Sequence, residues 1–427
     1  MSDSPDSKVS GGAVDRGAGN GWTQSESLAM DTALAAAALG VRGANPLVGA
    51  VVLDAAGKIL SVGHHRGAGT AHAEVDALAR VPAELTGKLA AATMVVTLEP
   101  CNHVGRTGPC AQAIIDAGIG RVSYAVDDPH QPAAGGARRL REAGVDVHGG
   151  LRADEAFALN RRWFASVRDS RPFITLHLAQ TLDGRIAAAD GTSQWITSTA
   201  ARADNHGIRR LIDAILVGTE TILVDNPRLT AREPDGSESM RQPLRVVMGL
   251  RDIPADAAVR GTNGVHGSDA PACAAPAPAP ACAAPAPAGT CAAPAGVGAG
   301  PAGVGVGSDA DVASNAGYLQ LRTRDPLAAA GTLFAGNVRH LMVEGGSRIS
   351  GAFLAAGLVD ELIIYLAPNL LGSGVPALGD LGIGTLADAQ QWAWDPAGGG
   401  PVTVLGPDLK LRLTPAAPFA AGTTGGN

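Results

Sequence analysis

Hydrophobic and polar positions divide the first part of the chain into short apolar runs that alternate with Ala-rich or amphipathic runs. A nearly all-apolar run such as 93–99 (TMVVTLE) is typical of a strand that is buried on both faces. Alternating strands and helices predict a layered α/β domain over residues 25–150. The expected strands are 48–54, 93–99 and 121–126, and the expected helices are 26–41, 73–81, 110–119 and 136–147, the last of which leads into a short strand.

The same alternation returns after a stretch, 151–170, that reads as a connecting helix. A second α/β domain is expected over 171–415, because apolar strands again alternate with amphipathic helices. The expected strands are 172–184, 213–218, 243–249, 340–346, 360–368 and 408–415, and the expected helices are 200–212 and 349–358.

The second domain is interrupted by residues 255–316, which consist mainly of Ala, Pro, Gly and Ser. A CAAPAPAPA run begins at Cys273, nearly repeats at Cys282 and is truncated at Cys291. Proline removes amide donors, and Ala and Gly bury little area, so this insertion is expected to be disordered. The spaced cysteines allow a metal-site interpretation, but no His or acidic partner lies among them, which favours repeat expansion in a loop. Residues 1–24 and 416–427 are expected to be disordered tails.

Composition narrows the class of protein. The net charge is −7 and no run of Lys or Arg stands out, which disfavours a nucleic-acid partner. No uninterrupted apolar stretch reaches the length of about 18 residues that a transmembrane helix needs, and the N-terminus does not resemble a secretory signal. Five cysteines in 427 residues do not suggest a disulfide framework, so a cytoplasmic protein without a membrane partner is expected.

One set of side chains indicates zinc chemistry. His72 and Glu74 lie at the start of a predicted helix, and Cys101 and Cys110 lie in TLEPCNHVGRTGPC, which follows a predicted strand. One His and two Cys can form a three-ligand zinc site that leaves the fourth position for water, whose pKa falls to roughly 7. A carboxylate beside the metal can then transfer protons, as in zinc deaminases. The alternatives are a structural zinc, which normally takes four protein ligands, or no zinc.

Eight residues separate the two cysteines, whereas the general deaminase pattern has two between them. This longer segment adds His103 and Arg106, and upstream motifs add Asn45 and His65. These polar groups could bind a phosphorylated substrate.

The motifs NPLVGAVV, HRGAGTAHAE, TLEPCNHVGRTGPC and VDDPH, taken in order, resemble those of the bifunctional deaminase-reductase family of riboflavin biosynthesis. The resemblance implies a cytidine-deaminase-like three-layer domain with His72, Cys101 and Cys110 as zinc ligands and Glu74 as the proton shuttle. It also implies that Asn45, His65, His103 and Arg106 lie near the pyrimidine or its ribose phosphate.

The second domain contains the strand-Gly-Gly-helix segment VEGGSRISGAFLAAGL. Gly345 and Gly346 suit a tight turn, and the amides of the helix start could hold a phosphate. No GxGxxG loop opens this domain, which disfavours a Rossmann fold. The polar segments TLDGRIAAADGTSQWIT and GTETILVDNPRLTAR are interpreted as loops that follow strands, where open α/β sheets bind ligands. They resemble the reductase domain of the same family, which implies a dihydrofolate-reductase-like fold.

By position, the resemblance implies NADPH as the cofactor of this domain and assigns two groups of residues. The NADPH site is expected to contain Ala179, Trp195, Thr221, Asp225, Gly346, Ser347, Arg348, Ile349, Ser350, Gly351 and Ala352. The substrate is expected to contact Ser193, Arg209, Leu229, Arg232 and Glu344. Arg209 could instead lie on a solvated helix face, and Trp195 could instead pack in the core.

Two positions depart from the family pattern. The family commonly has Lys where this chain has His177, and Asp-Ser where this chain has Gly249-Leu250. The first change removes a permanent charge near the reductase site, and the second removes a hydroxyl.

The resemblance implies a reaction sequence. The first domain deaminates a 2,5-diamino-6-(5-phosphoribosylamino)pyrimidinone, and the second reduces the ribosyl group to ribityl with NADPH. The family suggests a homodimer or homotetramer. Two alternatives stay open: a nucleic-acid base deaminase, and a protein in which one domain only binds or scaffolds.

Overall fold

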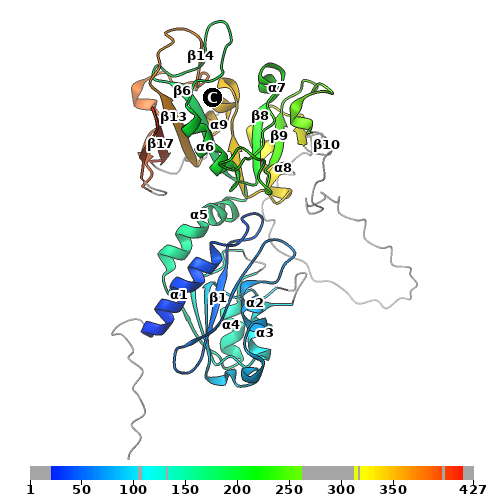
Figure 1. Cartoon of the computed structure of the whole chain (residues 1–427), viewed down its shortest axis with the longest axis vertical. Coiled ribbons are helices and arrows are strands. Elements are labelled where there is room, and N and C mark those ends of the chain that lie inside the picture. The colour runs from blue at the N-terminus through cyan, green and yellow to red at the C-terminus, as the bar shows by residue number, and fades with distance from the viewer. Residues whose placement is uncertain are drawn as a thin grey trace, which may run out of the picture.

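The chain folds into two α/β domains that are stacked along the long axis of the molecule, with one long helix between them (Figure 1). No helix in the described part of the chain is both long and apolar enough to cross a membrane. The computed structural model describes residues 21–103, 108–130, 133–261, 312–315, 318–396 and 400–416. Most of the predicted tails and most of the predicted insertion lie outside these ranges. The N-terminal tail was predicted to extend too far, because Thr23 caps a helix that begins at Gln24.

The first domain is built on a five-stranded sheet with the order β2-β1-β3-β4-β5. β1 pairs antiparallel with both β2 and β3, whereas β3, β4 and β5 are parallel. Because β3 and β4 are parallel neighbours, the segments that follow them meet at one edge of the sheet. The strands are β1 (Gly49–Leu53), β2 (Ile59–His64), β3 (Thr93–Leu98), β4 (Arg121–Val126) and β5 (Asp146–Gly149).

Helices cover both faces of this sheet, so the domain has three layers. Alternate side chains of β1 separate into two cores, with Val52 facing α2, α3 and α4 and Val51 facing α1 and the start of α5. α1 begins with a capping box in which Thr23 and Glu26 each accept the other's backbone amide. The helices are α1 (Gln24–Ala37), α2 (Ala73–Ala79), α3 (Cys110–Asp116), α4 (Gly136–Glu142) and α5 (Ala153–Asp169), with short 3-10 turns at Ala83–Leu85 and Leu89–Ala91.

α5 is the connecting helix, and its side chains hold both domains. The amide of Asn160 accepts from the backbone N–H of Leu47 and donates to its carbonyl, both at 2.8 Å. The next two residues, Arg161 and Arg162, donate to the fully buried carboxylate of Glu361 at 2.9 and 3.1 Å. The Glu361 charge is balanced by these guanidinium groups, which outweigh burial and lower its pKa.

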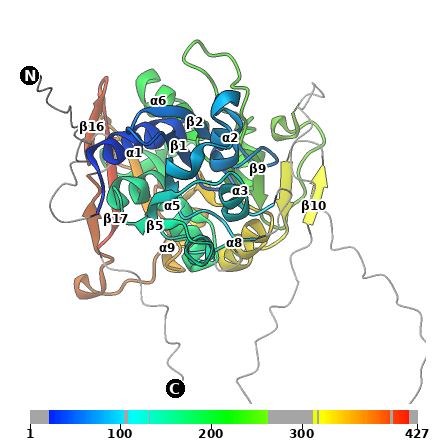
Figure 2. The ribbon, with the colours of Figure 1, turned by 90° about the horizontal axis from the view of Figure 1, so that it is seen from below.

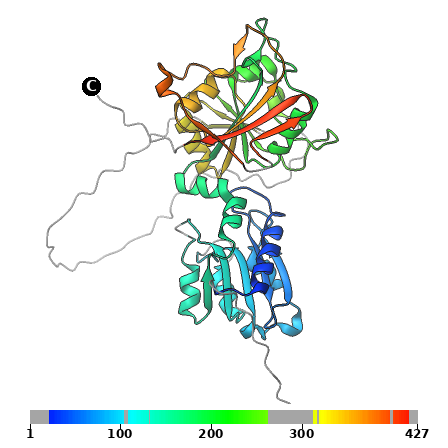
Figure 3. The same cartoon turned by 90° about the vertical axis from the view of Figure 1, so that its left-hand side faces the viewer.

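The second domain is built on a ten-stranded sheet with the order β10-β11-β9-β8-β12-β6-β13-β17-β15, and β16 also pairs with β17. The central strands are parallel, and the strands from β17 outward are antiparallel and face the viewer in Figure 3. Seen from below, β16 and β17 lie at one side of the first domain and β10 lies at the other (Figure 2). The strands are β6 (Phe173–Thr181), β7 (Arg185–Ala187), β8 (Ala214–Gly218), β9 (Leu244–Met248), β10 (Val312–Asn315), β11 (Tyr318–Leu321), β12 (His340–Val343), β13 (Glu361–Ala367), β14 (Val375–Pro376), β15 (Trp392–Trp394), β16 (Val402–Leu405) and β17 (Asp408–Pro415).

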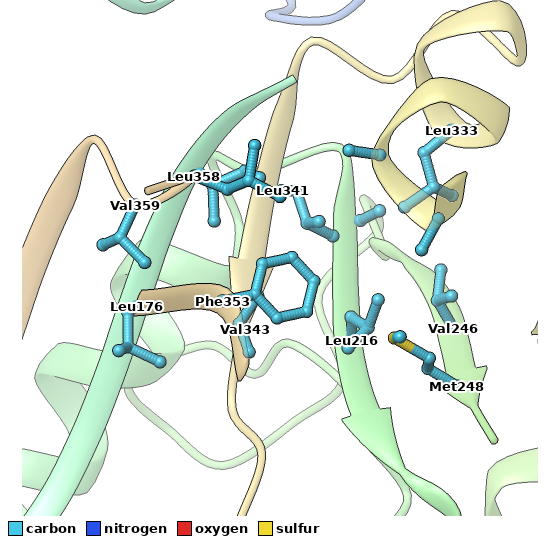
Figure 4. Packing of buried hydrophobic residues seen from close by; sticks show 14 of the residues in the cluster. Leu176, Leu216, Val246, Met248, Leu333, Leu341, Val343, Phe353, Leu358 and Val359 are labelled. Carbon is cyan, nitrogen blue, oxygen red and sulfur yellow. The ribbon is translucent and has the colours of Figure 1, made fainter. Parts of the chain in front are cut away.

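The largest core cluster lies between this sheet and two helices, α8 and α9 (Figure 4). Phe353 is fully buried among strand residues such as Leu216 and Val343, and burial of such a side chain stabilises the fold by about 1.5–3 kcal/mol. The helices of this domain are α6 (Thr199–Arg209), α7 (Thr219–Asp225), α8 (Pro326–Ala335) and α9 (Ser347–Ala355), with 3-10 turns at Ala258–Arg260 and Leu386–Asp388.

The structure corrects the sequence interpretation at several places. GTETILVDNPRLTAR, interpreted as a loop, begins with helix α7. The predicted insertion begins too early at 255, because Ala257 and Val259 are buried in a core cluster at the edge of the sheet, and its last residues include β10. β2, β7, α8, β11, β14, β15 and β16 were not expected.

Candidate active sites

Three side chains of the first domain meet as a possible metal-binding group. His72, Cys101 and Cys110 each offer one ligand atom, and these atoms lie within 4.8 Å of one another. The Nδ1 atom of His72 lies 3.6 Å from the sulfur of Cys101 and 3.3 Å from that of Cys110. With ordinary bond lengths, a tetrahedral zinc ion separates its sulfur and nitrogen ligands by about 3.6 Å, so the donor set fits zinc.

Secondary structure turns these three side chains toward one point. His72 is the N-cap of α2 but makes no capping bond with its side chain, Cys110 is the first residue of α3, and Cys101 follows β3. The backbone amide of Cys110 donates to the sulfur of Cys101 at 3.4 Å. The hydrogen bonds from Cys110 and His72 lower the pKa of Cys101 to about 4, so this sulfur is a thiolate at neutral pH.

Glu74 stands beside the donor set in the first turn of α2 and is buried. Burial raises its pKa to about 7, and the negative charge of Cys101 adds to this effect. A carboxyl group with this pKa can both accept and donate a proton at neutral pH.

His72, Cys101 and Glu74 line a cavity of about 290 Å³, and Cys110 is buried behind them. Asn45 and His65 lie side by side on its wall, with the Asn45 amide nitrogen 3.0 Å from Nε2 of His65. Nδ1 of His65 faces the carbonyl of Ala71 at 3.1 Å, which assigns the proton to Nδ1 and leaves Nε2 as an acceptor. Burial lowers the pKa of His65, so the ring is neutral. His103 also lines the cavity, and Arg106 lies outside the described residues.

Sequence reasoning missed several residues that line this cavity. Asp128 and His130 belong to the quoted VDDPH motif, which was a signal for them, and burial raises the pKa of Asp128 to about 6. Trp163 comes from α5, and Asn337 and Arg339 come from the second domain. No pattern in the sequence points to these three residues, because only domain packing brings them to the cavity.

The second candidate site follows from the sheet order. β8, β12 and β6 are adjacent and parallel, so the segments that follow them meet at one edge of the sheet. These segments carry most of the residues expected to bind NADPH and substrate. This is the edge at which open α/β sheets usually bind ligands.

Two residues that were expected in this site come from different segments of the chain and are in contact here. The hydroxyl of Ser193 donates to Asp225 at 3.1 Å, and Asp225 ends α7, which also carries Thr221. Trp195 is 69% exposed, so it does not pack in the core, and the guanidinium of Arg202 lies 4.5 Å from its ring centre.

Arg209 and Glu344 form the main charged pair of this site. Arg209 donates to Glu344 through Nε at 3.0 Å and Nη2 at 2.5 Å, and Asn205 donates to the same carboxylate at 3.0 Å. Arg209 is therefore paired and does not lie on a solvated face. Burial raises the pKa of Glu344, but the charge of Arg209 and the hydrogen bonds from Arg209 and Asn205 outweigh burial and lower the pKa to about 2. Asn205 was not predicted, although its i,i+4 spacing from Arg209 was a signal.

The Gly-Gly turn before α9 is open toward solvent at one position and closed at the other. A side chain at Gly346 would meet nothing within 4 Å, whereas one at Gly345 would approach Ile349 within 2.6 Å. Ser350 is buried and donates to the carbonyl of Gly345 at 3.2 Å. Gly351 packs against Gly379. Space for an anionic group therefore lies at Gly346 and the first amides of α9, which belong to Ser347, Arg348 and Ile349, with Ala352 one turn further.

The remaining expected contacts occupy different environments. Ala179 is half-buried on β6, and Leu229 is buried with a left-handed φ of 55°. The backbone of Arg232 forms an isolated antiparallel β-bridge with the backbone of Glu238. His177 is buried 5.1 Å from the ring of Tyr365, and burial lowers its pKa, so it carries no permanent charge.

Gly249 has a structural reason to be glycine in this chain. Its φ is 138°, and a side chain there would approach the hydroxyl of Thr219 within 2.8 Å. Leu250, which follows, is 51% exposed.

Family models match both domains. Residues 23–126 match the cytidine and deoxycytidylate deaminase zinc-binding region, and residues 172–271 and 312–397 match the RibD C-terminal domain. The chain is therefore a bifunctional enzyme with a zinc-binding deaminase domain and a reductase domain that uses NADPH.

Relatives of known name cover nearly the whole chain. The riboflavin biosynthesis protein RibD of Mycobacterium tuberculosis is 39% identical over 369 residues, which are 86% of this chain and 90% of that protein. The chain belongs to the RibD family of riboflavin biosynthesis enzymes. The structure of Acinetobacter baumannii RibD matches with a TM-score of 0.70 and 28% identity and covers 92% of this chain and 99% of that one. A diaminohydroxyphosphoribosylaminopyrimidine deaminase/5-amino-6-(5-phosphoribosylamino)uracil reductase from Thermotoga maritima matches with a TM-score of 0.67 and 25% identity, at 92% and 99% coverage.

Proposed function

We propose that the first domain hydrolytically deaminates 2,5-diamino-6-(5-phosphoribosylamino)pyrimidin-4(3H)-one and that the second domain reduces the product with NADPH to 5-amino-6-(5-phosphoribitylamino)uracil. Family membership and the printed name of the Thermotoga maritima protein support this choice of substrates. The observation that carries it is the meeting of the His72 imidazole with the sulfurs of Cys101 and Cys110, beside a cavity that is lined by His72, Cys101 and the buried carboxyl group of Glu74.

In this proposal, His72, Cys101 and Cys110 hold the zinc ion. Bound zinc would lower the pKa of a water in the open fourth position to about 7 and so supply the nucleophile. Glu74 takes a proton from the attacking water and delivers it to the leaving ammonia. Its pKa of about 7 suits both transfers.

Asn45, His65, His103 and Arg106 bind the pyrimidine or its ribose phosphate. The hydrogen bond between Asn45 and His65 fixes both side chains on the cavity wall, which supports a binding role over a catalytic one. His103 has a buried Nδ1 without a partner in the described part of the chain, so a substrate oxygen or nitrogen could satisfy it.

In the second domain, the protein orients C1′ of the sugar against the nicotinamide, and the cofactor supplies the hydride. Asp225 and Trp195, with Ala179 and Thr221, line the cofactor site, and the helix start from Gly346 to Ala352 receives its phosphates. Arg209, Glu344 and Arg232, with Ser193 and Leu229, contact the substrate. The charged pair of Arg209 and Glu344 holds both groups in fixed positions before the substrate binds.

The division of the chain belongs to the same proposal. It consists of a deaminase domain at 25–150, a connecting helix at 151–170 and a reductase domain at 171–415, with tails outside them. We also propose a cytoplasmic enzyme that assembles as a dimer or tetramer, which size-exclusion chromatography with light scattering will test.

One reaction mixture tests the whole proposal. Purified protein, the diamino substrate and NADPH are combined, and ammonia and NADPH absorbance are followed together. Equal molar amounts of ammonia released and NADPH consumed are expected. Ammonia release without NADPH consumption would show that the second domain only binds or scaffolds. Deamination of tRNA or single-stranded DNA in its place would favour a nucleic-acid deaminase.

A further inference from the structure

The wall of the deaminase cavity is not made by the deaminase domain alone. Trp163 and Val167 of α5 line it, and so do Asn337 and Arg339, which lie between α8 and β12 of the reductase domain. His72 and Cys101 of the donor set, together with Glu74, line the same cavity. A molecule that fills this space therefore touches both domains.

Arg339 is held in place by its own domain. The carboxylate of Asp213 accepts the backbone amides of Arg339 at 3.0 Å and of His340 at 2.9 Å. The guanidinium lies 4.1 Å from the ring centre of Phe334, and its Nη1 donates to the carbonyl of the same residue at 2.9 Å. The side chain therefore has a fixed position at the cavity.

The guanidinium keeps donors that the protein does not use. The Nε of Arg339 is buried and has no hydrogen-bond partner among the residues that the structure describes. Its Nη2 donates to the side chain of Asn337 at 3.5 Å, which is the outer limit of a hydrogen bond. An arginine in this state suits an anion with several oxygens.

The charges of the cavity make this arginine distinctive. The carboxyl groups that line the cavity belong to Glu74, Glu99 and Asp128, and its imidazole groups include those of His103 and His130. Among the described residues that line the cavity, Arg339 is the one side chain with a permanent positive charge. A dianionic phosphate needs such a cation to be bound away from bulk water.

The cavity continues into a smaller space at the seam between the domains. This second cavity, of about 30 Å³, shares Asn45, Trp163 and Arg339 with the first. It is also lined by Arg42 and Arg162, so basic side chains gather on the side of the cavity that Arg339 occupies.

We propose that Arg339 of the reductase domain binds the phosphate of the deaminase substrate, so that the deaminase site is complete only when both domains are present in their docked arrangement. This inference rests on the proposed function, because the phosphate belongs to the proposed substrate. The pyrimidine lies at Glu74 and the donor set, and the ribose phosphate extends toward the domain seam. Arg339 is a binding residue here and takes no part in the proton transfers.

The test is the deaminase KM of Arg339→Ala, measured by ammonia release without NADPH. Loss of a charged hydrogen-bonding group is expected to raise KM by roughly 10- to 100-fold and to change kcat little. Arg339→Lys keeps the charge without the planar fork and is expected to fall between the two proteins. Arg324→Ala removes an exposed arginine of the same domain and serves as the matched control.

The dephosphorylated form of the substrate separates a phosphate contact from a general effect on the site. With this compound, wild type and Arg339→Ala are expected to have the same KM. An equal rise of KM for both compounds, or an unchanged KM for the phosphorylated one, overturns the inference. Reduction of the deaminated intermediate and the melting temperature report whether each variant is folded, and Arg339→Lys replaces Arg339→Ala if the latter is not. A wild-type protein that releases no ammonia refutes the proposed function and the inference together, whereas an active wild type with an insensitive variant refutes the inference alone.

Discussion

The two candidate sites of this chain are built in different ways. In the deaminase domain, ligand atoms of His72, Cys101 and Cys110 already lie within 4.8 Å of one another, and His72 and Cys101 line a cavity. In the reductase domain, the expected residues are spread over three strand ends, and the charged groups Arg209 and Glu344 are paired with each other. A metal site needs all its ligands within bonding distance, whereas a site for a large cofactor needs only loops at one edge of a sheet. Single substitutions in the deaminase site are therefore expected to remove its activity without unfolding the chain. Single substitutions in the reductase site are expected to act mainly by lowering the stability of the fold.

The largest expected effect is on Glu74. Glu74→Gln removes both proton transfers, and the rate of ammonia release is expected to fall by about 100- to 10,000-fold. Zinc content and reduction of the deaminated intermediate should stay at wild-type levels. Glu84→Gln, which changes an exposed carboxylate of the same domain, is the matched control. Appreciable deamination by Glu74→Gln would contradict the role given to this residue.

Removal of the metal is the next largest effect. Cys101→Ser and Cys110→Ser are each expected to lower zinc affinity by more than about 100-fold, since they replace a ligand and not merely its support. Elemental analysis should show loss of zinc, and ammonia release should fall in proportion to that loss while NADPH consumption with the deaminated intermediate continues. A chelator should reproduce this pattern in the wild type, and added zinc should reverse it. One zinc per chain in both variants would rule out this donor set.

Acid is expected to lower the stability of the reductase domain by protonating Glu344. Its pKa is about 2 in the folded chain and near its ordinary value of 4.5 in the unfolded chain, so the unfolded chain binds the extra proton between these values. The stabilisation is complete above about pH 4.5 and is lost as the pH falls toward 2, and it amounts to about 3 kcal/mol.

Urea unfolding at pH 7 and pH 3 measures the contribution of Glu344 to the free energy of unfolding. Glu344→Gln is expected to be less stable than the wild type at pH 7 and to lose less stability on acidification. A wild type and a variant with the same dependence on pH would show that the pair of Arg209 and Glu344 contributes nothing.

The smallest expected effects come from two glycines. A methyl group at Gly136 would lie 1.7 Å from the carbonyl oxygen of Pro100, so Gly136→Ala is expected to cost about 1–3 kcal/mol of stability and to lower zinc affinity by displacing Cys101. At Gly331 in α8 a methyl group would meet nothing within 4 Å, and Gly331→Ala is expected to stabilise the chain by about 0.4–1 kcal/mol. Thermal unfolding and zinc titration measure both. A Gly136→Ala variant with wild-type zinc affinity would show that the Cys101 loop tolerates the shift.

Strands buried on both faces were predicted well, because an apolar run such as that of β3 has no other stable environment. α7 was missed because a seven-residue helix is marginal on its own and is formed by packing, here of Ile222 against the sheet. The insertion was started too early because Ala257 and Val259 resemble the Ala-rich sequence that follows, although both are buried.

The residues of the candidate sites also differ in whether the sequence could predict them. Residues next to one another in a motif, such as His72 and Glu74, could be predicted because the spacing within a helix start fixes their distance. Trp163 and Arg339 could not, since they are distant in sequence from the zinc motifs and reach the deaminase cavity only through the docking of two domains.

Helix α5 determines how the two domains unfold on heating. Its Asn160 is hydrogen-bonded to Leu47 in one domain, and the adjacent Arg161 and Arg162 donate to Glu361 in the other. Separation of either half would leave buried polar groups without partners, and such groups are costly in the interior. Heating should therefore give one calorimetric transition and not two. A free energy of unfolding measured for a substitution in one half will then belong to the whole chain.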